Sequence, residues 1–284
     1  MKSLFLATSA LVLSGLPAFA DGHATPTSGY ALAGDGSTLL VMADLSDPGA
    51  VAAYELSAAI NAIAWRPVTG ELLGFAGGMI GTIDPASGMM SDLGASFMDD
   101  AMIADGAAVA FDFNNQIDAV RAVSSGGDNL VYFPDGFGDN DERANSVLRF
   151  TDLAYGEGDA NEGATPAIFA NAYTNAINGE TASETFQYAL DAETNALVSL
   201  ANNAGTLATI APVTVDGEAV DLAAMGGFDI VSGAEGENMA YGILQFEGAE
   251  TAGLYSIDLE TGAARMLADL GIGGVTGFAA SMGM

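Results

Sequence analysis

The sequence has 284 residues, of which 50% are hydrophobic, enough apolar side chain for one large core or two small ones. Its 37 acidic residues against 6 basic ones give a net charge of −31, which repels nucleic acid and anionic membrane surfaces and excludes both as expected partners. The absence of cysteine excludes disulfides and thiolate metal sites, and a single histidine near the N-terminus, His23, argues against Ser-His-Asp catalysis.

The first twenty residues have the pattern of a secretory signal peptide. Met1 and Lys2 precede an apolar run from Leu4 to Leu16, and the segment ends in Ala18-Phe19-Ala20, a small-x-small cleavage signature. The run is too short and too interrupted for a bilayer span. We therefore predict a signal peptide over residues 1–20, a periplasmic or secreted protein with no membrane insertion after cleavage, and one domain over residues 21–284.

Downstream of this leader, glycine separates short apolar runs, which indicates many short strands and few helices. Turns that open with Asp and close with Gly or Asn recur between the runs, at residues 84–88, 191–195 and 258–262. The opening Asp can bond the backbone two residues on, and the closing residue tolerates a positive φ. These turns are typical of hairpins.

A third kind of apolar segment, ending in a turn, precedes the hairpins. It occurs five times, at residues 60–67, 109–114, 168–175, 227–232 and 275–281. The fifth copy is followed by nothing, whereas the strands expected at residues 29–33, 38–43 and 51–56 have no such segment before them. Pairing the two ends of the chain completes a four-stranded unit and closes a ring without leaving free edges.

The repeats have the length of propeller blades, about 45 to 60 residues. We predict an all-β fold, a β-propeller of five blades of four strands, closed by pairing of the C-terminal strand with the N-terminal strands.

Several motifs of the repeats occur together in one known family. They are Ala64-Trp65-Arg66-Pro67, Phe111-Asp112-Phe113-Asn114, the segment 155–163 and Ala172-Tyr173-Thr174-Asn175. With them the sequence resembles a bacterial exported-protein family described only as a domain of unknown function, number 4394. The resemblance implies a propeller-like β fold and assigns no catalytic residues.

Polar side chains of the repeated segments are expected near the propeller axis. Asp112 and Asp229 hold equivalent positions in two copies, and amides lie nearby at Asn114, Asn171 and Asn175. Calcium takes several oxygen ligands of these kinds, so one hypothesis is an axial calcium site. The alternative is that these side chains bond their own turns or Arg66.

Two acidic loops give a second calcium hypothesis. Asp139 and Asp141 in one loop, and Asp159 and Asn161 in the other, place oxygen atoms at alternate positions. Neither loop has the closing glutamate of the full twelve-residue calcium loop, so solvated turns are the alternative.

Three further side chains are candidates for ligand binding: Arg66, Arg121 and Tyr173. Arginine is scarce here, and Arg121 lies inside an expected strand, so we expect it to pair with a carboxylate such as Asp112 or Asp118. Capture of an anionic ligand is the alternative.

Complete repeats without a catalytic constellation favour a non-catalytic binding or scaffold protein, stabilised by calcium if the sites above bind it. Its partner would be a small molecule, a glycan or a protein. The alternative function is a calcium-dependent hydrolase of esters or lactones with the axial metal site.

Overall fold

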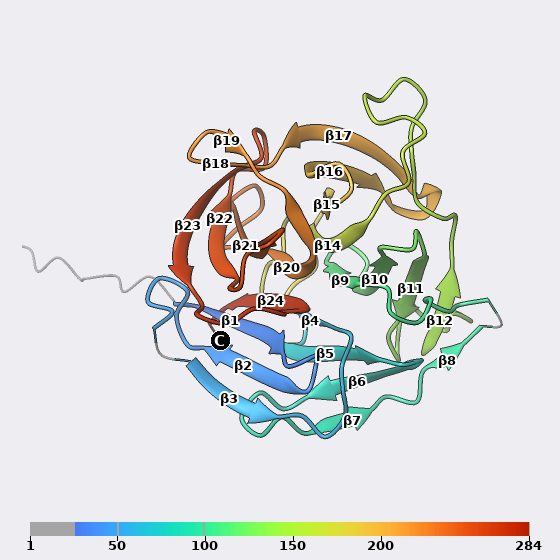
Figure 1. Ribbon diagram of the computed structural model, residues 1–284. Coiled ribbons are helices and arrows are strands. Elements are labelled where there is room, and N and C mark those ends of the chain that lie inside the picture. Colours follow the sequence, from blue (N-terminus) through green and yellow to red (C-terminus); the bar gives the residue numbers. More distant parts are fainter. Residues whose placement is uncertain (1–25, 50, 99, 284) are drawn as a thin grey trace, which may run out of the picture.

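The computed structural model describes residues 26–49, 51–98 and 100–283. The predicted signal peptide and His23 lie outside the described residues. Five sheets stand as blades around a central axis (Figure 1). This arrangement confirms the predicted all-β, five-bladed propeller.

Each blade is an antiparallel meander that starts at the axis. Blade 1 contains β24 (Gly277–Met282), β1 (Thr27–Ala33), β2 (Thr38–Met42) and β3 (Val51–Glu55). Blade 2 contains β4 (Ala62–Arg66), β5 (Glu71–Ala76), β6 (Met79–Ile83) and β7 (Met90–Asp92). Blade 3 contains β9 (Val109–Asn114), β10 (Ala119–Ser124), β11 (Asn129–Phe133) and β12 (Ser146–Arg149). Blade 4 contains β14 (Ile168–Tyr173), β15 (Gln187–Asp191), β16 (Ala196–Ala201), the 3-10 helix η1 (Asn202–Ala204) and β17 (Thr206–Pro212). Blade 5 contains β20 (Leu222–Ser232), β21 (Asn238–Phe246), β22 (Gly253–Ile257) and β23 (Ala263–Asp269).

The ring is closed by the two ends of the described chain. β24 pairs antiparallel with β1, in a register that runs from Thr27 opposite Met282 to Leu32 opposite Gly277. The innermost strands β24, β4, β9, β14 and β20 contact one another in this order around the axis (Figure 1). The C-terminal strand therefore supplies the innermost strand of blade 1, as predicted.

Three blades have more strands than the four that the repeats predicted. β8 (Ser96–Phe97) runs parallel to β12, β13 (Ala154–Tyr155) parallel to β17, and β18 (Thr214–Val215) parallel to β23, with β19 (Glu218–Ala219) beside β18. In each case the chain leaves the outer strand of one blade and covers the outer edge of the next before it turns inward. These short strands satisfy edge backbone groups that would otherwise be unpaired.

The core consists of apolar layers between neighbouring blades. Large side chains of an inner strand pack against the preceding blade, as Phe111 and Phe113 do against Ala64 and Phe75 of blade 2. Blade 1 meets blade 2 through Tyr30 and Trp65, whose rings stack with centroids 5.5 Å apart. Among the described residues, no helix is long and apolar enough to cross a membrane.

Candidate functional site

Two buried aspartates connect neighbouring blades at the axis. An innermost strand pairs on one side only, so the backbone groups of its other edge need partners of another kind. Asp112 Oδ2 accepts a 2.7 Å hydrogen bond from the backbone N–H of Tyr173 in the next blade. Asp229 Oδ2 accepts one of 2.6 Å from Ala280 N–H, and its Oδ1 accepts one of 2.6 Å from Ile230 N–H. The predicted alternatives, own turns or Arg66, are therefore not what these carboxylates bond.

The two carboxylates are poorly compensated. Each residue is 4% exposed, and neither takes part in the ion pairs that the described residues form. Burial raises the pKa of Asp229 to about 7. Burial, followed by the charge of Asp229, raises the pKa of Asp112 well above its usual value. The two carboxylates are therefore close enough for the charge of Asp229 to raise the pKa of Asp112, which disfavours ionisation of both at once.

The other amides predicted near the axis are used differently. Asn114 Oδ1 accepts hydrogen bonds from Gln116 N–H at 3.0 Å and from Thr185 Oγ1 at 2.9 Å. Asn175 Nδ2 donates to the carbonyl of Glu184 at 2.9 Å, and its Oδ1 accepts from Gly236 N–H at 2.8 Å. Both amides thus hold loops at the ends of their strands.

Within the described ranges, no three Asp, Glu, His or Cys side chains converge as metal ligands.

The axis contains a cavity of about 10 Å³, close to the space of one water molecule. All five innermost strands line it, and Asn171 contributes the one polar side chain among the residues described there. Asn171 is 1% exposed, and neither its Nδ2 nor its Oδ1 has a hydrogen-bond partner among the described residues. A buried amide without partners indicates an occupant that the protein atoms do not supply.

A larger opening lies on the face where the innermost strands begin, and we call it the upper groove. It consists of two adjoining cavities of about 300 and 280 Å³ that share Asn61 and residues 106, 107 and 109. The second of these also shares Val109 and Phe169 with the axial cavity. The groove therefore leads from the cleft between blades 2 and 3 to the mouth of the axis.

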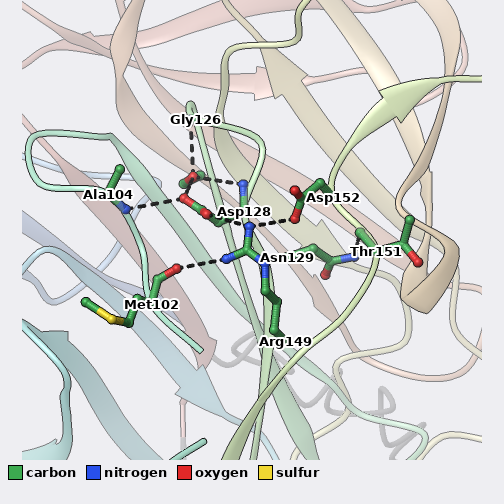
Figure 2. A network of polar contacts seen from close by, with 9 residues as sticks. Met102, Ala104, Gly126, Asp128, Asn129, Arg149, Thr151 and Asp152 are labelled. Carbon is green, nitrogen blue, oxygen red and sulfur yellow. Dashed lines mark hydrogen bonds and ion pairs between the residues drawn. The ribbon is translucent and has the colours of Figure 1, made fainter. Parts of the chain in front are cut away.

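One wall of the upper groove is residues 100–108, which we call the wall segment. Arg149 Nη1 donates to the carbonyl of Met102 at 3.1 Å, and Ala104 N–H donates to Asp128 Oδ2 at 3.4 Å (Figure 2). Arg149 Nη2 also bonds Asp128 Oδ1 at 2.9 Å and Asp152 Oδ1 at 2.6 Å (Figure 2). One charged network therefore fixes the backbone of the wall segment on blade 3.

Asp128 stays ionised within this network. Burial raises the pKa of Asp128, but the hydrogen bonds from Ser124, 2.6 Å away, and from Arg149 outweigh it and leave the pKa below its usual value. We did not predict this network from the sequence, in which the scarcity of arginine is the one signal that points to it.

Arg66 is part of a structural ion pair. Its Nε and Nη2 bond the two carboxylate oxygens of Asp118 at 2.8 and 2.5 Å, and its Nη1 lies 3.3 Å from Glu71 Oε2. The pair joins β4 of blade 2 to the β9–β10 turn of blade 3. Arg66 is thereby engaged within the fold.

Arg121 does not pair with a carboxylate, so that prediction is wrong. Its Nε donates to Tyr173 Oη at 2.9 Å, its Nη2 donates to Asn203 Oδ1 at 2.8 Å, and its Nη1 donates to Asn129 Oδ1. The expected partners are taken, because Asp112 bonds a backbone N–H and Asp118 bonds Arg66. Arg121 and Tyr173 instead form a buried polar contact between blades 3 and 4.

Hydrogen bonds within the two acidic loops explain most of their side chains. Asp141 binds Arg143 through both oxygens, at 2.9 and 2.7 Å, and these bonds lower the pKa of Asp141 to about 2. Asp159 accepts from the backbone and hydroxyl of Thr209, each at 2.7 Å, and Asn161 Nδ2 bonds the same hydroxyl at 2.8 Å. Asp139 is exposed. Neither loop directs its carboxylates toward a common point.

No curated protein matches the sequence. Solved structures similar to this chain include a protein of unknown function from Bacteroides thetaiotaomicron, with a TM-score of 0.46 and 13% identity over 81% of this chain and 55% of that one. An auxiliary nutrient binding protein from Bacteroides ovatus has a TM-score of 0.43 and 14% identity over 75% of this chain and 52% of its own. A gluconolactonase from Xanthomonas campestris has a TM-score of 0.41 and 16% identity over 85% of this chain and 75% of its own.

The chain spans about half the length of the first two of these structures. At such identities and TM-scores the likenesses carry no argument about a ligand or a reaction. A family model described as "Domain of unknown function (DUF4394)" matches residues 40–279.

Proposed function

The chain belongs to the family described as a domain of unknown function, DUF4394, and from this premise we propose that it is an exported, non-catalytic binding propeller whose ligand occupies the upper groove. The observation that carries the proposal is a preformed groove with a fixed wall, held by Arg149 and Asp128. Ligand sites are commonly largely preformed concave surfaces of this size, about 300 to 1,000 Å³.

The lining defines the class of ligand. Phe75 and Phe97, whose rings meet edge-on with centroids 6.2 Å apart, form an apolar side together with Ile103. Asn61 and Thr276 supply polar groups, and the buried hydroxyl of Thr276 has no partner among the described residues. An apolar body with one or two hydrogen-bonding groups fits such a surface.

Charge narrows the class further. Asp35 and Asp105 lie at the groove, and the whole chain has a net charge of −31. An anionic ligand would be repelled at long range, whereas a neutral or cationic one would not. We therefore assign the groove to a small amphipathic molecule that is neutral or positively charged.

The hydrolase alternative has weaker support. The carboxylates that it requires, Asp112 and Asp229, are 4% exposed and accept hydrogen bonds from backbone N–H groups of the next blade. A general base or a metal-bound nucleophile must reach the substrate, and burial of this degree opposes that. Turnover of an ester and lactone panel that is lost in Asp112→Asn would favour the hydrolase.

The binding proposal can be tested with one variant whose new side chain fills the groove. Ala107 lines both cavities, so Ala107→Phe should occupy the space where they join. The probe is a panel of neutral and ammonium-bearing aromatic fragments, followed by saturation-transfer NMR. Fragments that bind the wild type should lose their signal in Ala107→Phe.

The matched control is Ala160→Phe, which adds the same side chain to an exposed loop far along the chain. Fragment signals should persist in this variant. Equal signals in both variants, or no binding by the wild type to any class of fragment, would overturn the proposed use of the groove.

A further inference from the structure

We infer that the ligand of the upper groove carries a neutral hydroxyl group on a short unbranched arm, which enters the axial cavity and hydrogen-bonds to Asn171. The inference rests on the proposed function, because it assigns the inner end of the ligand that the groove binds. It starts from a buried amide without partners and from the place of the axial cavity next to the groove.

The axial cavity continues the second cavity of the upper groove into the propeller. Thr276, the residue before β24, lines the second cavity, and Gly277, the first residue of β24, lines the axial one. Val109 and Phe169 line both. The buried Oγ1 of Thr276 has no hydrogen-bond partner among the described residues, so a polar ligand atom can be bonded at the entrance as well.

Asn171 lies at the inner end of this path. It follows Phe169 by two positions on β14, and two residues of a strand span about 6 to 7 Å. Asn171 is 1% exposed, and both of its polar atoms lack partners among the described residues. An amide buried without hydrogen bonds is unfavourable, so a ligand group that bonds this amide gains free energy that an apolar group would not.

Size and hydrogen-bonding capacity select a hydroxyl group for this place. The axial cavity of about 10 Å³ has the space of one water molecule, and a hydroxyl group is a ligand end of that size. A hydroxyl group donates and accepts, so it matches the amide of Asn171 in either orientation. It also reproduces the hydrogen bonds that a water molecule would make there, so replacing such a water costs the ligand no hydrogen bond.

The rest of the lining opposes a charged end. Apart from Asn171, the side chains described around the cavity are apolar, and an ammonium or carboxylate group would lose its hydration there without compensation. Asp112 and Asp229 do not line the cavity, and their oxygens accept hydrogen bonds from backbone N–H groups. Any positive charge of the ligand therefore belongs to the part that stays in the groove.

Three aromatic probes of similar size test the inference: 2-phenylethanol, 2-phenylethylamine and propylbenzene, whose arms end in hydroxyl, ammonium and methyl. Their dissociation constants are measured by NMR titration of the wild type and of Asn171→Leu, which keeps the side-chain volume close and removes the amide. The preference for the alcohol over propylbenzene should fall about tenfold or more in Asn171→Leu. Comparing the two proteins cancels the difference in hydrophobicity between the probes. The preference for the amine over propylbenzene should stay the same.

Gln187→Leu is the matched control. Gln187, on β15, is 2% exposed and also lacks partners for both amide atoms, but it lines neither the axial cavity nor the upper groove. The preference for the alcohol should therefore be that of the wild type. An equal preference in wild type and Asn171→Leu would overturn the inference and leave the groove proposal intact. A loss confined to the amine would also overturn it, because the inner end would then be a cation.

One measurement needs no variant. Crystals of the wild type soaked with 2-phenylethanol should show the hydroxyl oxygen at hydrogen-bond distance from Asn171, about 2.5 to 3.2 Å. A ring in the upper groove with its hydroxyl group elsewhere, and a water molecule on Asn171, would overturn the inference alone. If none of the three probes binds the wild type, the inference fails, and the wider fragment panel decides whether the groove proposal fails with it.

Discussion

The carboxylate of Asp229 accepts a 2.6 Å hydrogen bond from the backbone N–H of Ala280, so blade 5 is bonded directly to the strand that closes the ring. The closing strand β24 is thereby held on two sides, by its ladder with β1 and by Asp229. Asp112 makes the equivalent bond, 2.7 Å long, to Tyr173 N–H between blades 3 and 4. These carboxylates replace the missing strand partner at the inner edge of the next blade.

Replacing Asp229 by Asn should weaken this closure. The two oxygens of Asp229 each accept a backbone N–H, and the amide of Asn would direct its own N–H groups at one of them. A buried donor left without an acceptor costs about 1 to 3 kcal/mol, and we expect Asp229→Asn to lower the free energy of unfolding by that amount in urea titrations at about pH 4, where Asp229 is protonated in the folded state.

The control for this variant is Asp269→Asn, where an exposed carboxylate accepts a 2.9 Å bond from Gly271 N–H. A change within about 0.5 kcal/mol is expected there, because water can replace the lost bond. Equal losses in the two variants would show that Asp229 has no special part in closing the ring.

Stability should fall as the pH rises from about 4 to about 7. The pKa of folded Asp229 is about 7, above its unfolded value of 3.8, because burial disfavours the charged form. Between these values the folded state binds more protons than the unfolded state. The free energy of unfolding should therefore decrease as pH rises from about 4 to about 7, by up to about 1.4 kcal/mol per pH unit for this group, and level off above it.

Urea titrations at several pH values between these limits measure the slope, and Asp229→Asn removes the part of it that Asp229 causes. The repulsion of other acidic side chains adds a pH dependence of its own, which the variant retains. The difference between wild type and variant is therefore the quantity of interest. Parallel pH profiles would contradict the raised pKa of Asp229.

Close packing of the inner strands requires glycine at position 227. An ideal Cβ there would lie 2.3 Å from the backbone N and 2.6 Å from Cβ of Phe278, on β24. Gly227→Ala should push β20 from β24 and lower the free energy of unfolding by about 1 to 3 kcal/mol or more. At Gly49 the nearest atom, Asp47 Oδ1, is 3.6 Å away, so Gly49→Ala should be neutral or slightly stabilising. The midpoints of denaturant-induced unfolding compare Gly227→Ala with Gly49→Ala.

The ring was predictable because its signal is repeated. The alternation of large and small side chains in the innermost strands recurs in each blade, and the copy at residues 275–281 matches the inner strand that the N-terminal strands lack. The short outer strands were not predictable. β8 and β13 each consist of two residues, which is too short for any periodic pattern, and they pair with strands of the next blade.

The candidate site was predictable in part. Asp112 and Asp229 were expected near the axis, but their partners are backbone N–H groups, which every residue other than proline has, so the sequence carries no mark of them. The Arg121 prediction failed for a different reason. Asp118 is 52 positions from the arginine that it binds, Arg66, and ion pairs between blades leave no spacing signal in one sequence.

The upper groove was missed altogether, because it is formed by loops and strand ends of several blades. Its wall segment, residues 100–108, has small residues without periodicity and is positioned by side chains of β11, β12 and their flanks. The sequence contains these residues but does not indicate which loops meet.

Arg149 should therefore determine both local stability and the shape of the groove. It bonds the carbonyl of Met102 and the carboxylates of Asp128 and Asp152, and Asp128 bonds Ala104 N–H (Figure 2). In Arg149→Gln the glutamine side chain is too short to keep these contacts. Asp128 then stays charged but has lost its arginine partner. Hydrogen bonds to charged groups are worth about 1.5 to 3 kcal/mol, so a loss of that order is expected in urea titrations.

The same variant should weaken fragment binding, because the wall segment loses the bond from Arg149 to Met102, Asp128 loses its partner, and the groove is no longer preformed. Arg265→Gln removes the same charge from an exposed position of β23 and should change stability by no more than about 0.5 kcal/mol, with fragment binding intact. If Arg149→Gln loses stability but binds fragments as the wild type does, the network supports the fold alone, and the ligand does not depend on the wall that Arg149 holds.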